Sequence, residues 1–287
     1  MLIPLIGWVF LLVGLCAALI GPIELYTFYL FSAGGRFHYD GFGFGSLMFG
    51  NIAIQTGGYY VIALVGITLG YGHIRGADWS RKIALALLWD WLILGLPLSL
   101  IAFLMLLTSK DIPVASLPFV LVLLSLLYPI LPVLAVRFYQ SDRVRKAFRP
   151  SSSYNWVGKT PQAVLTLGVL MILSVLALHI PILFNGAFPL FGHVHYGLDG
   201  ITMLDLAILV LAVLTWGMFR QSRRAWWGTM LFFCTMITSS IATFLSVDPH
   251  QVILEMRFSS LEMDALQGMP VEGYHLALLI SLPALLT

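Results

Sequence analysis

Asp90 is the residue whose chemistry stands out most, because it lies between Trp89 and Trp91 inside a long apolar segment. In a helix that rises about 1.5 Å per residue, its separation from Arg81 amounts to about 13 Å, which is close to the middle of a bilayer. An ionised carboxylate there costs at least about 2.5–3.5 kcal/mol unless it is paired. We therefore expect Asp90 to face the interior of a helix bundle, to be protonated, or both. Its role is either proton or cation coupling, or a hydrogen bond that joins two helices.

Three other polar residues lie inside apolar segments. Asp205 is about one and a half turns inside its helix, where either a water-filled vestibule or an interhelical hydrogen bond would satisfy it. Asn51 and Gln55 give another helix a polar face, and the segment 225–247 carries a run of hydroxyl residues. Small and hydroxylated residues in membrane helices are typical of close packing, and the alternative is a permeation path. The intramembrane polar candidates are Asp90, Asp205, Asn51 and Gln55.

A second group of candidates combines histidine, tyrosine and acidic residues near the predicted outer ends of the helices. Imidazoles and carboxylates are the usual ligands of zinc, copper or iron, so His38, His193 and His195 are the metal-binding candidates. His193 and His195 point the same way only if their segment is extended. Three hypotheses stay open: a metal or redox site, a pH-responsive or substrate-contacting patch, and ordinary interfacial loops. The candidate outer patch consists of Glu24, His38, Tyr39, Asp40, His179, His193, His195 and Asp199.

No motif identifies a catalytic residue or a cofactor. The sequence contains no GxSxG, no P-loop, no HExxH and no CxxC. The glycines at 41, 43 and 45 follow no predicted strand, so they do not predict a phosphate-binding loop. Cys16 and Cys234 lie in apolar runs without a histidine neighbour, and we expect both to be buried and inert.

The elements that position these residues are transmembrane helices. The chain is 60% hydrophobic and 10% charged, whereas a soluble domain carries roughly 25% charged residues. A helix needs about 20 apolar residues to cross the hydrocarbon core. The sequence therefore predicts an all-α membrane protein with about eight spans, and enzymatic activity is uncertain and not favoured. The predicted spans are 3–31, 46–73, 83–108, 114–138, 161–185, 200–219, 225–247 and 272–287.

The basic residues predict the orientation of these spans. The segments 74–82, 137–160 and 220–224 hold twelve of the fifteen Lys and Arg residues. The positive-inside rule assigns that side to the cytoplasm, so both termini are expected there. This topology predicts a multi-pass protein of the cytoplasmic (inner) membrane, as in bacteria. The last span lacks the basic residue that follows its counterpart, so we expect the chain to continue beyond Thr287.

Weak internal similarity predicts a duplication. Four pairs of segments match in the same order, at offsets between about 145 and 160 residues. They indicate a first four-helix unit at 1–140, a basic linker at 141–160 and a second unit at 161–287 with an external insert at 248–272. An even number of spans per unit gives both copies the same orientation, related by an axis along the membrane normal. The matched segments are Gly-Pro-Ile at 21–23 with Ile-Pro-Ile at 180–182, His38-Tyr39 with His195-Tyr196, Tyr71-Gly72-His73-Ile74-Arg75 with Trp216-Gly217-Met218-Phe219-Arg220, and Leu131-Pro132 with Leu282-Pro283.

The favoured function is therefore a transporter-like protein or an accessory subunit of a membrane complex. The alternative is a membrane enzyme or redox protein with a His/Asp site on its outer face. The expected partners are the lipid bilayer and other membrane proteins. Nucleic acid is not expected, because the net charge is only +2 and topology accounts for the basic residues.

Overall fold

The computed structural model describes residues 2–39, 42–43, 45–108, 117–148, 156–256, 258 and 262–263. Seven helices in this part of the chain are long and apolar enough to cross a membrane. A multi-pass helical membrane protein, as the sequence predicts, is thereby supported by length and composition. The seven helices correspond to the first seven predicted spans; the third starts earlier than predicted, at Asp78, and the α-helix of the fifth ends earlier, at Leu178. The eighth predicted span, 272–287, lies outside the described residues.

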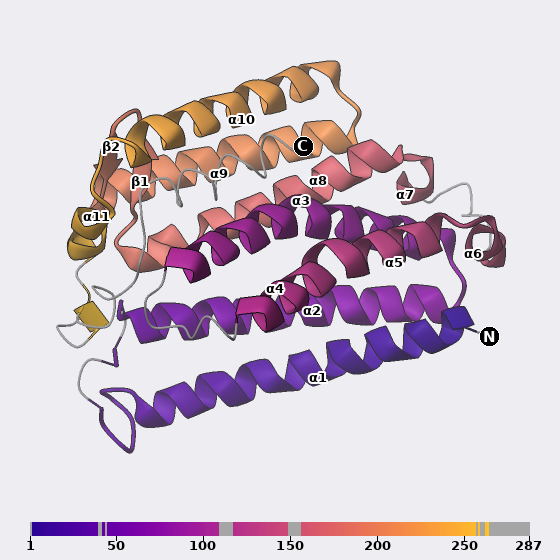
Figure 1. Cartoon of the computed structure of the whole chain (residues 1–287), viewed down its shortest axis with the longest axis horizontal. Helices are drawn as coiled ribbons and strands as arrows, with labels where there is room; N and C mark the ends of the chain where they lie inside the picture. Colours follow the sequence, from indigo (N-terminus) through magenta and orange to yellow (C-terminus); the bar gives the residue numbers. More distant parts are fainter. Residues whose placement is uncertain are drawn as a thin grey trace. The chain divides into compact units, whose positions relative to one another are not determined.

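The elements follow one another along the chain as Figure 1 shows. The long helices are interrupted at one point, where α4 passes through the π-helical turn η2 into α5. The bounds are α1 Leu2–Phe31, α2 Leu47–Ile74, α3 Asp78–Thr108, α4 Leu117–Ser125, η2 Leu126–Ile130, α5 Leu131–Gln140, α6 Asp142–Ala147, α7 Trp156–Lys159, α8 Gln162–Leu178, the 3-10 helix η3 Pro181–Phe184, β1 Phe188–Leu190, β2 His193–His195, α9 Gly197–Phe219, α10 Arg223–Phe244 and α11 Pro249–Glu255.

The contacts divide the chain into two compact units. The first unit comprises Met1–Ala84 and Tyr139–Thr160, and the second comprises Leu85–Phe138 and Pro161–Thr287. These units are defined by packing, whereas the predicted division at 140 and 160 is defined by sequence similarity. The predicted division therefore stays a prediction.

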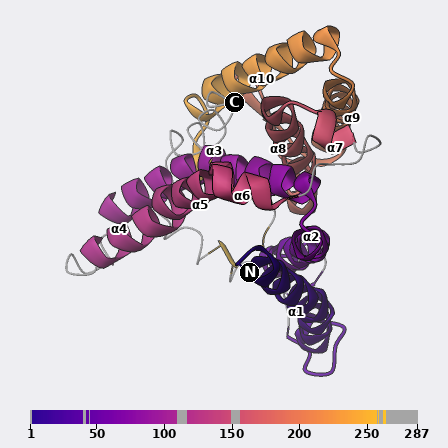
Figure 2. The same ribbon diagram turned by 90° about the vertical axis from the view of Figure 1, so that its right-hand side faces the viewer.

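Close backbone contact between α1 and α2 holds the first unit together, and Figure 2 shows the two helices side by side. Gly7, Gly14 and Gly21 recur every seven residues, which keeps them on one face of α1. A Cβ added to Gly14 would lie 2.7 Å from the backbone nitrogen of Ile67, and one added to Gly7 would lie 2.8 Å from that of Ile74. Only glycine permits such an approach, which is a usual way for membrane helices to pack.

The turns that join α2 to α3 and α9 to α10 have the same geometry. In each turn, three backbone N–H groups donate to the last helical turn in the same pattern. In each, an arginine lies over the aromatic ring four residues earlier: Arg75 is 4.5 Å from the Tyr71 ring, and Arg220 is 3.9 Å from the Trp216 ring. Two separate parts of the chain thus adopt one local structure. The residues in the left-handed conformation are Gly76 (φ 62°) and Gln221 (φ 56°).

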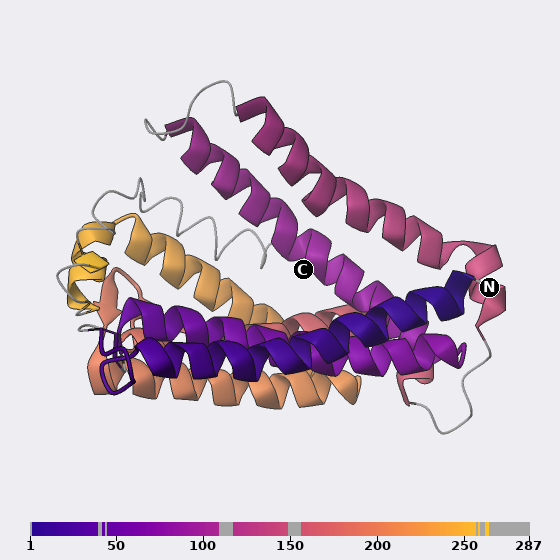
Figure 3. The same ribbon diagram turned by 90° about the horizontal axis from the view of Figure 1, so that it is seen from below.

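The second unit contains the helices α8, α9 and α10 and, beside α3, the helix pair α4–α5 (Figure 3). One apolar cluster joins the three helices through Met171 on α8, Leu211 on α9 and Ala225 on α10. A second cluster, around Leu204 and Phe188, lies beneath the hairpin β1–β2. Burial is modest elsewhere, because much of the surface of a membrane helix faces hydrocarbon.

The hairpin β1–β2 was not predicted from the sequence. Its strands are antiparallel, with Phe188 opposite His195. The two residues of its turn, Phe191 and Gly192, both have positive φ, which is typical of a type I′ turn. The backbone N–H of Phe191 donates to the Ser239 hydroxyl of α10 over 3.0 Å. Hydroxyl groups of α10 therefore anchor the turn.

The prediction of buried cysteines is wrong. Cys16 and Cys234 are both free thiols and both exposed. The prediction relied on apolar neighbours as a sign of burial, which holds in water. In a membrane helix the apolar side faces either the protein or the lipid, so apolar neighbours do not distinguish the two.

Candidate functional site

Asp90 is buried at the centre of α3. It is 1% exposed, whereas its neighbours Trp89 and Trp91 are 36% and 42% exposed. Its position places it about 18 Å from the start of the helix at Asp78. The carboxyl group of Asp90 is therefore buried, whereas the two neighbouring indoles are partly exposed.

Both carboxyl oxygens of Asp90 lack a hydrogen-bond partner among the described residues. A buried polar group without a partner is rare, because leaving it unpaired costs about 1–3 kcal/mol and more if it is charged. Inside a membrane, such a carboxyl group is a candidate for function. Asp90 is the most deeply buried carboxyl group of the described residues, at 1% exposure against 8% for Glu262.

A cavity of about 280 Å³ lies between α3 and α8 at the level of Asp90. On α3 its wall is formed by Trp89 and Ile93, which precede and follow Asp90. On α8 its wall is formed by Gln162, Ala163, Thr166 and Leu167. Asp90 lies within the stretch of α3 that borders this cavity, although its own side chain does not line it.

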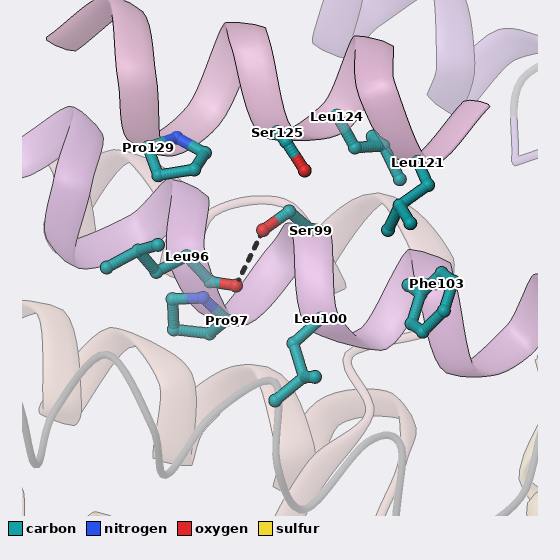
Figure 4. A pocket seen from close by; sticks show the side chains of 9 residues that line it. All are labelled: Leu96, Pro97, Ser99, Leu100, Phe103, Leu121, Leu124, Ser125 and Pro129. Carbon is teal, nitrogen blue, oxygen red and sulfur yellow. Dashed lines mark hydrogen bonds between the residues drawn. The ribbon is translucent and has the colours of Figure 1, made fainter. Parts of the chain in front are cut away.

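A larger cavity of about 420 Å³ lies farther along α3, between this helix and α4, as Figure 4 shows. Pro97 on α3 and Pro129 in the π-helical turn both line it, and each removes a backbone N–H from its helix. The Ser99 hydroxyl donates to the carbonyl of Leu96 on its own helix, over 2.9 Å. The lining is thus mainly apolar and suits hydrocarbon better than a charged ligand. The lining residues are Leu96, Pro97, Ser99, Leu100, Phe103, Leu121, Leu124, Ser125 and Pro129.

The other intramembrane candidates are arranged differently from Asp90. Asp205 is exposed on the surface of α9, and no hydrogen bond or ion pair joins it to another described residue. Asn51 is also exposed, and its side-chain oxygen accepts a 3.1 Å hydrogen bond from Gln55 on the next turn of α2. Asn51 and Gln55 thus satisfy each other along one helix. Asp90 differs from these three because it is buried and has no hydrogen-bond partner among the described residues.

Glu24, which the sequence placed in the outer patch, lies on α1 where this helix packs against α2. Its Oε2 atom is buried without a partner among the described residues, and so is the Oγ1 atom of Thr56 on α2. Gly21 brings α1 close to this level, since its added Cβ would lie 3.8 Å from Thr56 Cγ2. The first unit therefore also holds polar atoms that need a partner, although Glu24 itself is only half-buried.

The remaining outer-patch residues are divided between the two units. In the first unit, His38 has a left-handed backbone (φ 43°), and the ring of Tyr39 lies 5.8 Å from that of Phe31. Asp40 lies outside the described residues. In the second unit, His179 Nδ1 lies 2.7 Å from the carbonyl of Val175, and Asp199 is in the first turn of α9. The two sets are therefore not shown to form one patch.

His193 and His195 lie on strand β2, so their side chains project from the same face of an extended segment. Residues directly opposite each other in a hairpin also share a face, which places His195 beside Phe188 of the buried cluster. Next to the strand, burial and the Glu255 carboxylate raise the pKa of Tyr196. Its hydroxyl is thus a hydrogen-bond donor at neutral pH.

The metal hypothesis combines His38 from the first unit with His193 and His195 from the second. Within the described part of the chain, no three His, Cys, Asp or Glu residues are grouped so that they could hold a metal ion. The metal site stays a prediction.

A buried histidine that sequence reasoning did not select lies in the first unit. His73 is fully buried, with Nδ1 2.7 Å from the Leu69 carbonyl and Nε2 2.8 Å from the Tyr139 hydroxyl. Because a carbonyl only accepts, Nδ1 carries the proton, and in the neutral ring Nε2 then accepts from Tyr139. The sequence analysis used His73 only for the repeat. The position of His73 in the last turn of an apolar helix is the feature of the sequence that could have indicated a buried histidine.

Comparison with protein-family models, with curated proteins and with solved structures finds no match to this chain.

Proposed function

We propose that this multi-pass membrane protein is a transporter-like protein in which Asp90 accepts and releases the coupling proton. The observation that carries the proposal is the carboxyl group itself, which is 1% exposed and has no hydrogen-bond partner among the described residues. A group used only to join two helices would bond to the neighbouring helix. A carboxyl group that takes up and releases protons has to remain without a fixed hydrogen bond to a neighbouring helix.

A proton suits Asp90 better than a metal cation does. A cation such as Ca²⁺ takes six to eight oxygen ligands. Asp90 offers one carboxyl group, and the described residues hold no group of three His, Cys, Asp or Glu that could complete a cation site. A single carboxyl group is sufficient for a proton.

The proposal includes a topology of eight spans in a cytoplasmic (inner) membrane, with both termini on the basic side and 272–287 as the last span. It also includes a duplication of a four-helix unit. The basic segments support the orientation. The shared geometry of the α2–α3 and α9–α10 turns, with Arg75 and Arg220 at matching positions, supports the duplication.

Proton flux into proteoliposomes tests the role of Asp90. The purified chain is reconstituted with a trapped pH-sensitive dye, and a potassium diffusion potential drives proton entry. Asp90→Asn keeps the shape of the side chain but cannot exchange a proton, so we expect its flux to fall to that of protein-free vesicles. Asp205→Asn is the matched control, because Asp205 is exposed. Flux of Asp90→Asn equal to that of the unmodified protein would contradict the proposal.

A second measurement does not require the substrate. Dicyclohexylcarbodiimide reacts with protonated carboxyl groups in apolar surroundings, and mass spectrometry identifies the modified peptide. We expect modification of Asp90 and none at that peptide in Asp90→Asn. An unmodified Asp90 peptide, together with normal flux after treatment, would argue against a proton-exchanging carboxyl group.

The alternative is a membrane enzyme or redox protein with its site at the hairpin. Its supporting observation is that His193 and His195 project from one face of β2. Elemental analysis and an absorption spectrum of the purified protein test it, with a His193→Ala/His195→Ala variant as the control. Stoichiometric metal that this variant loses would favour the alternative. The accessory-subunit form of the proposal predicts co-purification with a membrane partner without crosslinking.

A further inference from the structure

We propose that the cavity between α3 and α8 is a water-filled entrance through which protons reach the level of Asp90. This inference rests on the proposed function, because it supplies the route to the group that exchanges the proton. Its walls belong to the second unit alone.

The lining residues form one continuous face on each helix. Trp89 and Ile93 are four residues apart on α3, and Ala163 and Leu167 are four apart on α8. Residues at this spacing lie one above the other on a helix surface. The cavity therefore extends along the two helices over about one turn of each, and Asp90 is within that turn of α3.

The cavity lies on the side of α3 nearer its basic end, and it begins at the basic end of α8. On α3, Arg81 and Lys82 precede it, and on α8 it begins at Gln162, the first residue of the helix. In the first unit, Lys82 Nζ donates to the carbonyls of Gly158 and Thr160, over 2.6 Å and 3.2 Å, in the segment that leads into α8. If the basic side is cytoplasmic, the entrance opens toward the cytoplasm.

Polar groups on the cavity wall require a partner that hydrocarbon cannot provide. Thr166 Oγ1 is buried and has no hydrogen-bond partner among the described residues. Such groups are normally satisfied by ordered water. A lipid chain in the cavity would leave them unpaired.

The cavity is large enough for a short chain of water molecules. Its volume of about 280 Å³ compares with about 30 Å³ for one water molecule in the liquid. A proton arrives along the water chain at the level of Asp90, whose carboxyl group does not itself line the cavity. When this carboxyl group meets the water chain, a hydronium ion transfers the proton to one of its oxygens. An O–H bond forms on the carboxyl group, and neutral water remains. Release of the proton reverses this transfer, and no other reactant is needed.

Cysteine accessibility tests whether the cavity holds water. Cys16 and Cys234 are first replaced by serine, because both are exposed. Thr166→Cys then places a thiol on the cavity wall. The matched control is Ser174→Cys, two turns along α8, where the native hydroxyl is half-buried and donates to the Leu170 carbonyl over 2.9 Å. A charged, membrane-impermeant methanethiosulfonate reagent is added on the basic side of sealed vesicles.

We expect Thr166→Cys to react at least about tenfold faster than Ser174→Cys, because thiols react as solvated thiolates. The bulky adduct should also block proton flux in the first variant only. Equal rates at the two positions, or reaction of Thr166→Cys only with a membrane-permeant reagent, would overturn the inference. If Thr166→Cys does not fold, Ala163→Cys carries the same test, since Ala163 also lines the cavity.

The outcomes separate this inference from the proposed function. If Thr166→Cys reacts but Asp90→Asn leaves the proton flux unchanged, the cavity is hydrated and Asp90 is not the coupling group. If Thr166→Cys does not react but Asp90→Asn abolishes the proton flux, Asp90 is the coupling group and protons do not reach it through this cavity.

Discussion

At the scale of single residues, Asp90 and His73 represent two ways of burying a polar group in a membrane helix. Both nitrogens of His73 have a hydrogen-bond partner, whereas neither oxygen of Asp90 has one among the described residues. The pairing of His73 joins α2 to Tyr139 within the first unit, which is a structural role. The unpaired state of Asp90 leaves it free to exchange a proton, which is why the two residues receive different assignments.

The His73–Tyr139 bond predicts a loss of stability when the hydroxyl group is removed. Tyr139→Phe keeps the ring but leaves Nε2 of the buried His73 without a donor, so we expect the free energy of unfolding to fall by about 1–3 kcal/mol. Tyr71→Phe is the control, because Tyr71 is 50% exposed. Unfolding in detergent is followed by circular dichroism. Equal stabilities of the two variants would mean that the bond contributes nothing.

At the scale of elements, the hairpin α1–α2 depends on glycines that face α2. Gly14→Leu places a side chain where even a Cβ would lie 2.7 Å from the Ile67 nitrogen. We therefore expect α1 to separate from α2, and a spin-label pair on the two helices would report a longer distance. Gly57→Leu on α2 is the matched control, because no atom lies within 4 Å of its added Cβ. An unchanged distance in Gly14→Leu would contradict the close packing.

The hairpin β1–β2 depends on hydroxyl groups of α10. Ser239 Oγ accepts from Phe191 N–H and donates to the Pro189 carbonyl over 3.0 Å, and Thr243 Oγ1 accepts from Gly192 N–H over 3.0 Å. The double variant Ser239→Ala/Thr243→Val removes these partners. We expect amide hydrogen exchange at 191 and 192 to accelerate about tenfold or more, since each bond contributes about 1 kcal/mol.

Ser246→Ala is the control for the hairpin variant, because the Ser246 hydroxyl donates to the Ala242 carbonyl of its own helix. Exchange rates in the double variant that match those of this control would show that the hairpin is held in another way. The measurement also bears on the alternative function, since the hairpin carries His193 and His195.

At the scale of the whole molecule, the distribution of basic residues predicts the topology. Reporter domains fused after Gln140 and after Arg224 should be active only in the cytoplasm, and one fused after Val247 only on the outer side. The same pattern should place the end of 272–287 in the cytoplasm. A cytoplasmic position for residue 247 would contradict the orientation and would reverse the side from which Asp90 is reached.

The positions of the seven described candidate spans were predictable from the sequence because they depend on a local property. About 20 consecutive apolar residues are needed to cross the hydrocarbon core, whatever surrounds the helix. The seven described spans therefore agree closely with the predicted ranges. The strand formed by His193, Val194 and His195 was not predicted. The sequence indicated only that the two imidazoles would share a face if this segment were extended.

The sequence alone thus determined the helices and the presence of Asp90 within one of them. Which way each side chain faces depends on how the helices pack: Asp90 is buried and Asp205 is exposed, although both lie in apolar runs. The physical reason is that lipid and protein interior are both apolar, so a membrane helix has no amphipathic pattern to mark its buried side. The cavity near Asp90 and the hydrogen bonds between the hairpin and α10 could not be predicted from the sequence either, because each involves residues far apart in the chain. Both features arise from packing between helices, and the local order of residues does not specify that packing.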